Sequence, residues 1–138
     1  MVANMRVARC ACGGVTATVE SEPQFVVLCN CTHCQRRTGS PFGVGVYFPR
    51  DAVTLAGETK TFVRGVDGTD RTLTNHFCPE CGGTVYWTLD LRPNHIGIAA
   101  GSFTDPDFAK PTRVVWTQHK YAWVALPADV PAFAQAVK

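Results

Sequence analysis

Cys29, Cys31 and Cys34 form the densest group of reactive side chains in the sequence, with three thiols inside six residues. The side chains of a Cys-x-Cys step rarely reach the geometry of a disulfide. A Cys-x-x-Cys step suits a tetrahedral zinc ion, which thiolate sulfur binds at about 2.3 Å. Three thiolates leave the fourth position of such an ion to another ligand. The stretch therefore predicts a metal site whose fourth ligand decides its chemistry.

The other four cysteines form two pairs, each followed directly by glycine. These pairs are Cys10-x-Cys12-Gly13 and Cys78-x-x-Cys81-Gly82. Together they can supply the four thiolates of a closed structural zinc site. Such a site would tie the N-terminal part of the chain to its middle, so that metal binding would contribute to folding. The seven cysteines therefore predict two zinc ions per chain, divided four and three.

Two interpretations of the three-cysteine group remain open. In the first, His33, His76 or a buried carboxylate completes a second structural site. In the second, the fourth position is open to water or to a substrate thiol, as in catalytic zinc sites. A thiol that reaches zinc loses its proton and becomes a nucleophile or a held thiolate. An iron–sulfur cluster is a lesser alternative for closely spaced cysteines.

The composition is that of an ordinary globular protein. The chain has 138 residues, 46% hydrophobic and 17% charged, which predicts one domain over residues 1–138. A formal net charge of +2 gives no reason to expect nucleic acid or a membrane surface as a partner. Residues 1–6 lack the apolar core of a signal peptide. These features indicate a cytoplasmic protein, and disulfides are rare in that compartment.

Short β-rich runs separated by glycine and proline predict an all-β fold with little helix. The expected strands cover residues 15–20, 25–28, 42–48, 52–55, 59–64, 71–77, 84–89, 96–100, 113–116 and 121–125. One or two helical turns are expected over residues 32–38, with Thr32 as N-cap and Gly39 as terminator. A short closing helix is expected over residues 131–137.

The order of these motifs along the chain resembles that of the glutathione-dependent formaldehyde-activating enzyme family, over nearly the whole length. The closing Trp123 also fits this family. The motifs that carry the resemblance are Cys10-x-Cys12-Gly13, Cys29-x-Cys31-x-x-Cys34, Gly39-Ser40-Pro41-Phe42, Phe77-Cys78-x-x-Cys81-Gly82 and Gly101-x-Phe103-x-Asp105-Pro106.

The resemblance implies a β-tent fold of layered antiparallel sheets. It implies that the four paired cysteines hold a structural zinc and that Cys29, Cys31 and Cys34 hold a catalytic one. The implied activity is the reversible condensation of formaldehyde with glutathione to S-hydroxymethylglutathione, a carbon–sulfur lyase reaction. Many members carry a His-Ile-Trp-like run near the C-terminus, whereas this chain has Val114-Val115-Trp116. The role of that histidine is therefore absent or displaced here.

Glutathione carries two carboxylates, so its site should offer cations. Arg36 and Arg37 directly follow the cysteine group and are candidate partners, with exposed arginines at a helix end as the alternative. The weaker candidates are Arg64, Arg71, Arg113 and Lys120. Gly43 and Gly45 could admit the peptide backbone of a ligand beside a strand. His33 and His76 are the candidate general acids by chain position.

Large aromatic residues are expected to lie in the core rather than in a ligand pocket. This expectation covers Phe42, Tyr47, Phe48, Trp87, Trp116 and Trp123.

The leading functional hypothesis is a small zinc enzyme acting on a thiol, with glutathione and formaldehyde as the implied substrates. The alternative is a non-catalytic, zinc-stabilised module that binds a thiol ligand or a protein partner. An open zinc position favours the enzyme, and a site closed by three cysteines and a histidine favours the module. A third hypothesis is metal or redox buffering by the three-cysteine group.

Overall fold

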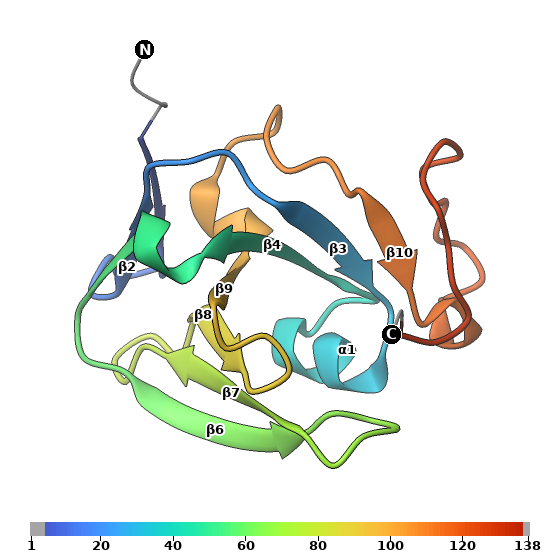
Figure 1. Ribbon diagram of the computed structural model, residues 1–138, viewed down its shortest axis with the longest axis horizontal. Coiled ribbons are helices and arrows are strands. Elements are labelled where there is room, and N and C mark those ends of the chain that lie inside the picture. The colour runs from blue at the N-terminus through green and yellow to red at the C-terminus, as the bar shows by residue number, and fades with distance from the viewer. Residues whose placement is uncertain (1–4, 137–138) are drawn as a thin grey trace.

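The computed structural model describes residues 5–136 and is built from two β-sheets and one α-helix within that range (Figure 1). The three-stranded sheet has the order β1-β2-β5, and the seven-stranded sheet has the order β10-β3-β4-β9-β8-β7-β6. The strands are β1 (Arg6–Arg9), β2 (Thr16–Val19), β3 (Phe25–Cys29), β4 (Gly43–Pro49), β5 (Val53–Ala56), β6 (Lys60–Gly65), β7 (Thr72–Phe77), β8 (Thr84–Leu89), β9 (His95–Ala99) and β10 (Arg113–Val115). The α-helix is α1 (Thr32–Thr38), and three 3-10 turns are η1 (Arg50–Ala52), η2 (Ala100–Phe103) and η3 (Thr117–His119).

All strand pairs within these sheets are antiparallel except β10 with β3, which is parallel. The seven-stranded sheet bends around α1, so that the helix lies between β3 and β4 on one side and β6 and β7 on the other (Figure 1). None of the helices among residues 5–136 is long and apolar enough to cross a membrane. The expected all-β fold with little helix is confirmed.

One face of the seven-stranded sheet packs in the hydrophobic core, and the other face carries a pocket. Because directly paired residues share a face, the register places Val46, Ile98 and Tyr86 in one row across β4, β9 and β8. This row is buried in the core, which the three-stranded sheet covers with residues such as Ala17 and Val19. The neighbouring row necessarily points to the other face, and that face carries the pocket described below.

Most of the expected elements form with shifts of one or two residues. The helix spans the expected residues and ends at Gly39, whose φ of 66° is the left-handed conformation that glycine adopts readily. Its N-cap, however, is Cys31 rather than Thr32, because the Cys31 sulfur accepts the N–H of Cys34.

Three expectations about the elements are wrong. β1, with the sequence Arg-Val-Ala-Arg, was not expected as a strand, and its pairing with β2 creates it. Residues 121–125 form a turn and irregular chain rather than a strand. Residues 131–136 contain a bridge to β10 and no helix, while residue 137 lies outside the described range.

Candidate functional site

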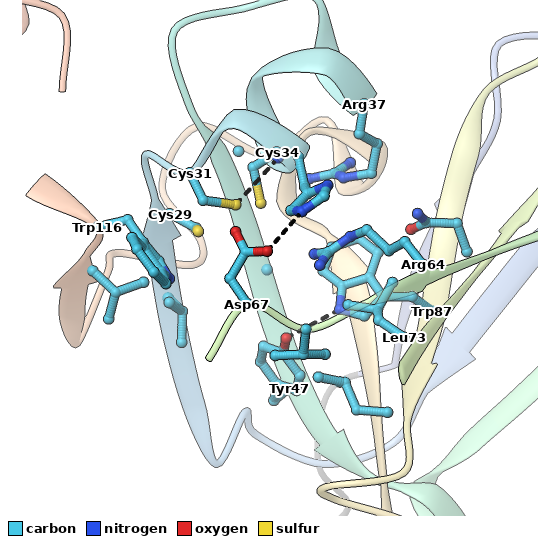
Figure 2. A pocket seen from close by; sticks show the side chains of 18 residues that line it. Cys29, Cys31, Cys34, Arg37, Tyr47, Arg64, Asp67, Leu73, Trp87 and Trp116 are labelled. Carbon is cyan, nitrogen blue, oxygen red and sulfur yellow. Dashed lines mark hydrogen bonds and ion pairs between the residues drawn. The ribbon is translucent and has the colours of Figure 1, made fainter. Parts of the chain in front are cut away.

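The three-cysteine cluster forms where β3 ends and α1 begins. Cys29 is the last residue of β3, Cys31 caps α1, and Cys34 lies in the first turn of the helix. Their three sulfur atoms lie within 4.8 Å of one another, and Figure 2 shows them gathered at one side of a pocket. The N–H of Cys34 donates to the Cys31 sulfur over 3.3 Å, which fixes the orientation of that sulfur.

The thiols of this cluster cannot all ionise without a nearby cation. Hydrogen bonds from the Cys29 and Cys34 thiols lower the pKa of Cys31 to about 2. The hydrogen bond to Cys31 in turn raises the pKa of Cys29, since a second thiolate beside the first is repelled. A bound divalent cation removes this repulsion and favours the thiolate form of every ligand. The donor set therefore fits a thiophilic metal ion.

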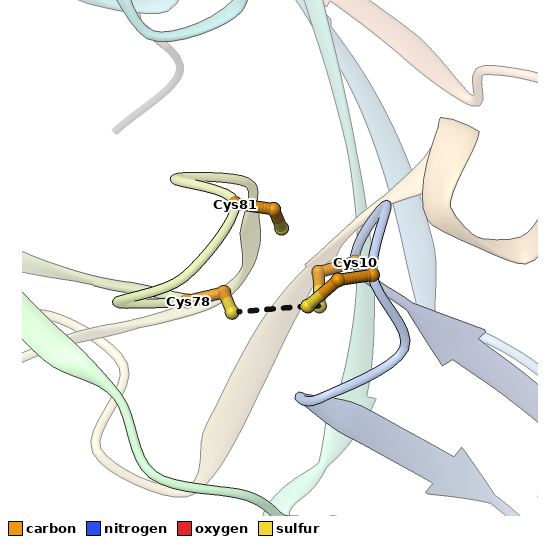
Figure 3. A group of neighbouring side chains, drawn as sticks. Cys10, Cys78 and Cys81 are labelled. Atoms are coloured by element: carbon orange, nitrogen blue, oxygen red, sulfur yellow. Dashed lines mark hydrogen bonds between the residues drawn. The ribbon is translucent and has the colours of Figure 1, made fainter.

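The four-cysteine cluster joins two turns that are far apart in sequence. Cys10 and Cys12 lie between β1 and β2, while Cys78 and Cys81 lie between β7 and β8, and Figure 3 shows the two turns facing one another. All four sulfur atoms lie within 4.8 Å of one another. The Sγ–Sγ distances are 3.7 Å from Cys10 to Cys12 and 3.5 Å from Cys12 to Cys78. A tetrahedral ion with 2.3 Å bonds to sulfur requires an edge of about 3.8 Å.

Backbone N–H groups point at these sulfur atoms, as expected for thiolates. The N–H of Val15 donates to Cys10 over 3.2 Å, and the N–H of Glu80 donates to Cys78 over 3.4 Å. Such bonds stabilise the charged form of the sulfur. Both cysteine clusters are thus arranged to hold a metal ion, one in a complete four-ligand set and one in a three-ligand set.

A cavity of about 150 Å³ lies next to the three-cysteine cluster. It occupies the concave face of the seven-stranded sheet, where the register aligns Asn75, Trp87, Gly97 and Tyr47 in one row across β7, β8, β9 and β4. Residues of α1 and of the segment after β6 complete its wall. The four-cysteine cluster contributes no residue to this cavity.

The indole of Trp87 forms the floor of the pocket. A Cβ atom at Gly45 would lie 2.7 Å from the Trp87 ring, and one at Gly97 would also overlap it. The glycine at position 45 therefore admits a protein side chain, where the sequence suggested the backbone of a ligand. Gly43 does the same for Arg37, because a Cβ there would overlap the guanidinium. These close approaches hold the Trp87 ring flat against the sheet.

Two polar groups are held by this indole. Trp87 Nε1 donates to the Tyr47 hydroxyl over 3.0 Å, and the Arg37 guanidinium lies 4.5 Å from the centre of the ring. Burial raises the pKa of Tyr47 to about 12, so its hydroxyl keeps its proton at neutral pH. Since the tyrosine oxygen already accepts from Trp87, its own hydrogen is left to be donated.

The expectation that the large aromatic residues lie in the core is confirmed for Phe48 alone, which is fully buried. Tyr47, Trp87 and Trp116 line the pocket, Trp123 is 75% exposed, and Phe42 is half-buried outside the core. The reason is the alternation along β4, which turns Phe48 to the core and its neighbour Tyr47 to the pocket.

Only one of the two candidate arginines lies in the pocket. Arg37 lines the pocket, whereas Arg36 is exposed and borders a shallow groove outside it with Tyr121. Arg64, from β6, also lines the pocket, and Figure 2 shows it extending from the strand toward the cysteines. Arg64 was one of the weaker candidates by sequence, and its pairing with Leu73 places it on the pocket face.

Only one of the two candidate histidines lies in the pocket. His33 lines the pocket, and its Nε2 lies 3.3 Å from the carboxylate of Asp67, so that α1 is linked to the turn after β6. His76 faces the opposite side of the sheet, where it stacks on Tyr86 and contacts the Thr59 hydroxyl over 3.2 Å. Burial lowers the pKa of His76.

Fold and site together define a thiol-rich β protein with two cysteine clusters that could hold metal ions and a small pocket at one of them. The chain belongs to the glutathione-dependent formaldehyde-activating enzyme family, which matches residues 5–119. No curated protein matches the chain significantly. Among solved structures, a crystal structure of a Rhodobacter sphaeroides protein, a structural genomics target, is similar with a TM-score of 0.56 and 17% identity. The match covers 91% of this chain and 98% of that one and supports the fold alone.

Proposed function

We propose that this protein is a zinc-dependent carbon–sulfur lyase that adds a small thiol such as glutathione reversibly to formaldehyde. The observation that carries the proposal is that the incomplete set, Cys29, Cys31 and Cys34, opens onto the cavity, while the complete four-cysteine set does not. This difference supports a catalytic role for the first set and a structural role for the second. Membership of the family supports the substrates.

The reaction requires few catalytic groups. Cys29, Cys31 and Cys34 would hold the zinc ion, and the chemistry that it would supply there is a lower pKa for a substrate thiol. In the forward direction the S–H bond breaks, the sulfur forms a bond to the aldehyde carbon, and the aldehyde oxygen gains a proton. The product is the S-hydroxymethyl adduct, and the reverse reaction releases both substrates.

The pocket supplies a hydrogen-bond donor for the developing oxygen. The Tyr47 hydroxyl lines the cavity with its hydrogen free to donate, because Trp87 occupies its acceptor side. We assign to Tyr47 the stabilisation and protonation of the alkoxide, and to Arg37 a contact with a substrate carboxylate. A reducing cytoplasm would keep all seven thiols available for metal.

The experiment that tests the proposal is NMR exchange spectroscopy of formaldehyde and its glutathione adduct, with and without the metal-loaded protein. We expect faster exchange with the wild type, a return to the uncatalysed rate with Cys31→Ser, and an unchanged effect with Ser21→Ala. Ser21 is a matched control, since its hydroxyl bonds only the nearby carbonyl of Glu22 among the described residues and it does not line the pocket.

Uncatalysed exchange in the presence of fully metal-loaded wild type would contradict the proposed reaction of glutathione with formaldehyde. The hypotheses that remain would then be a reaction of another thiol, the non-catalytic module that binds a thiol or a protein partner, and metal or redox buffering by the three-cysteine group.

A further inference from the structure

Two arginines in the pocket have no carboxylate partner among residues 5–136. Arg37 lies over Trp87, and Arg64 donates one hydrogen bond to the Gly65 carbonyl over 3.0 Å. The carboxylate that also lines the cavity, Asp67, has its contact with His33. Arginine carries five N–H donors in a planar fork, so each of these side chains retains donors for a ligand.

A third polar group in the cavity also lacks a partner. Asn75 is 8% exposed, and its side-chain oxygen has no hydrogen bond within the described part of the chain. An amide can present its oxygen or, after half a turn, its N–H groups to the same point. Buried polar groups are almost always satisfied in proteins, so an unsatisfied amide in the wall that also carries Arg37 and Arg64 supports a polar ligand in this pocket.

The cavity is too small to enclose a whole tripeptide. Its volume is about 150 Å³. Pockets that enclose ligands of about twenty non-hydrogen atoms, the size of glutathione, are roughly 300 Å³ or more. The enclosed part of the pocket therefore holds only a portion of such a ligand.

We infer that the pocket selects a compact thiol carrying a carboxylate a few bonds from its sulfur, with Arg64 as a partner of that carboxylate in addition to Arg37, and with Asn75 as a further polar contact. The inference rests on the proposed thiol site and narrows its substrate class. A free mercapto-carboxylic acid fits entirely, whereas glutathione would place only its cysteinyl portion inside the pocket.

The arginines could instead serve only to offset the charge of the cysteine cluster. Arg64 contributes to the lowered pKa of Cys31, though less than the neighbouring thiols do. In that case loss of Arg64 would change the affinity for neutral thiols and for carboxylate-bearing thiols by the same factor. If Arg64 binds a carboxylate, its loss would weaken the binding of carboxylate-bearing thiols more. The two explanations therefore predict different ratios between these two affinities.

The test is calorimetric binding of two probes to the metal-loaded full chain, 3-mercaptopropionate and its neutral analogue 3-mercaptopropionamide. We expect the carboxylate to bind about tenfold or more tighter than the amide in the wild type, and this ratio to fall at least about fivefold in Arg64→Gln. Because the probes differ in thiol acidity, the ratio is compared between variants. Lys60→Gln removes a charge from the same strand outside the pocket and should leave the ratio unchanged.

If the ratio of the two affinities is the same in the wild type and in Arg64→Gln, the inference is overturned and the proposed thiol site is left intact. Tighter binding of glutathione than of 3-mercaptopropionate would overturn the compact substrate class. Binding of neither probe nor glutathione would overturn the proposed thiol site as well. Arg64→Lys, which keeps the charge without the planar fork, should retain part of the selectivity.

Discussion

Trp87 determines the arrangement of the pocket at the scale of single residues. Its ring contacts the backbone at Gly45 and Gly97, its N–H orients Tyr47, and the Arg37 guanidinium lies over its ring. An aromatic ring held in this way loses little further freedom when a ligand binds, so the groups around it are preorganised. The resulting pocket places a neutral donor and a cation near the three thiols.

The neutral state of Tyr47 can be tested by its titration. We expect the difference in tyrosinate absorbance between the wild type and Tyr47→Phe to have a midpoint near pH 12, since burial raises the pKa of Tyr47. The unfolded chain would lose this proton near pH 10, so stability from this group is present below about pH 10 and is lost as the pH rises through 12. A difference titration with a midpoint near 10 would show that the hydroxyl is solvated.

At the scale of elements, α1 is held in place by its neighbours rather than by its own stability. A helix of seven residues is too short to be stable alone in water. The Gln35 side chain donates to the Asn30 carbonyl over 2.8 Å and to the His119 carbonyl over 3.1 Å. His33 joins the helix to the turn after β6. These links bring cysteines and arginines from different elements to one cavity.

The four-cysteine cluster joins the turns of two hairpins, and its loss should destabilise both. Cys81→Ser removes one ligand of the proposed structural zinc, whose binding free energy contributes to folding. We expect thermal unfolding to show a melting temperature lower by roughly 10 °C or more. Glu80→Gln is the matched control, since its exposed side chain is adjacent while the backbone N–H to Cys78 is retained. A normal melting transition for Cys81→Ser would exclude a structural role for the cluster.

At the scale of the whole molecule, the hydrophobic core and the pocket lie on opposite faces of the larger sheet. The three-stranded sheet covers the core face of the larger sheet, and the four-cysteine cluster lies where the two sheets meet. The pocket lies on the other face of the larger sheet. Substitutions in the pocket can therefore alter the three-cysteine site with little effect on the core.

This separation predicts the metal content of the protein. We expect about two zinc ions per chain in the wild type and about one in Cys31→Ser, which should stay folded. Elemental analysis combined with native mass spectrometry would measure the stoichiometry, and circular dichroism would report the fold. A single zinc in the wild type, or unfolding of Cys31→Ser, would contradict the division of the cysteines into four and three.

Local sequence patterns determined much of this structure. The spacing of the cysteines predicted both clusters, and alternating apolar residues predicted most strands, because these features depend on neighbours along the chain. Gly39 also predicted the end of α1, because a helix end depends on the left-handed backbone conformation of a single residue. The C-terminal segments, whose pattern was ambiguous, were predicted wrongly.

Only the tertiary structure decided which side chains share the pocket. A strand alternates its faces with a period of two, but the face that becomes core or pocket depends on strands far away in sequence. The sequence does not tell which of the neighbours Tyr47 and Phe48 points to the core. The pairing of β4 with β9 turns Phe48 to the core and Tyr47 to the pocket. Arg64 reaches the cysteines because β6 forms the edge of a sheet that bends around α1. Residues brought together by such long-range pairing leave no local signal in the sequence.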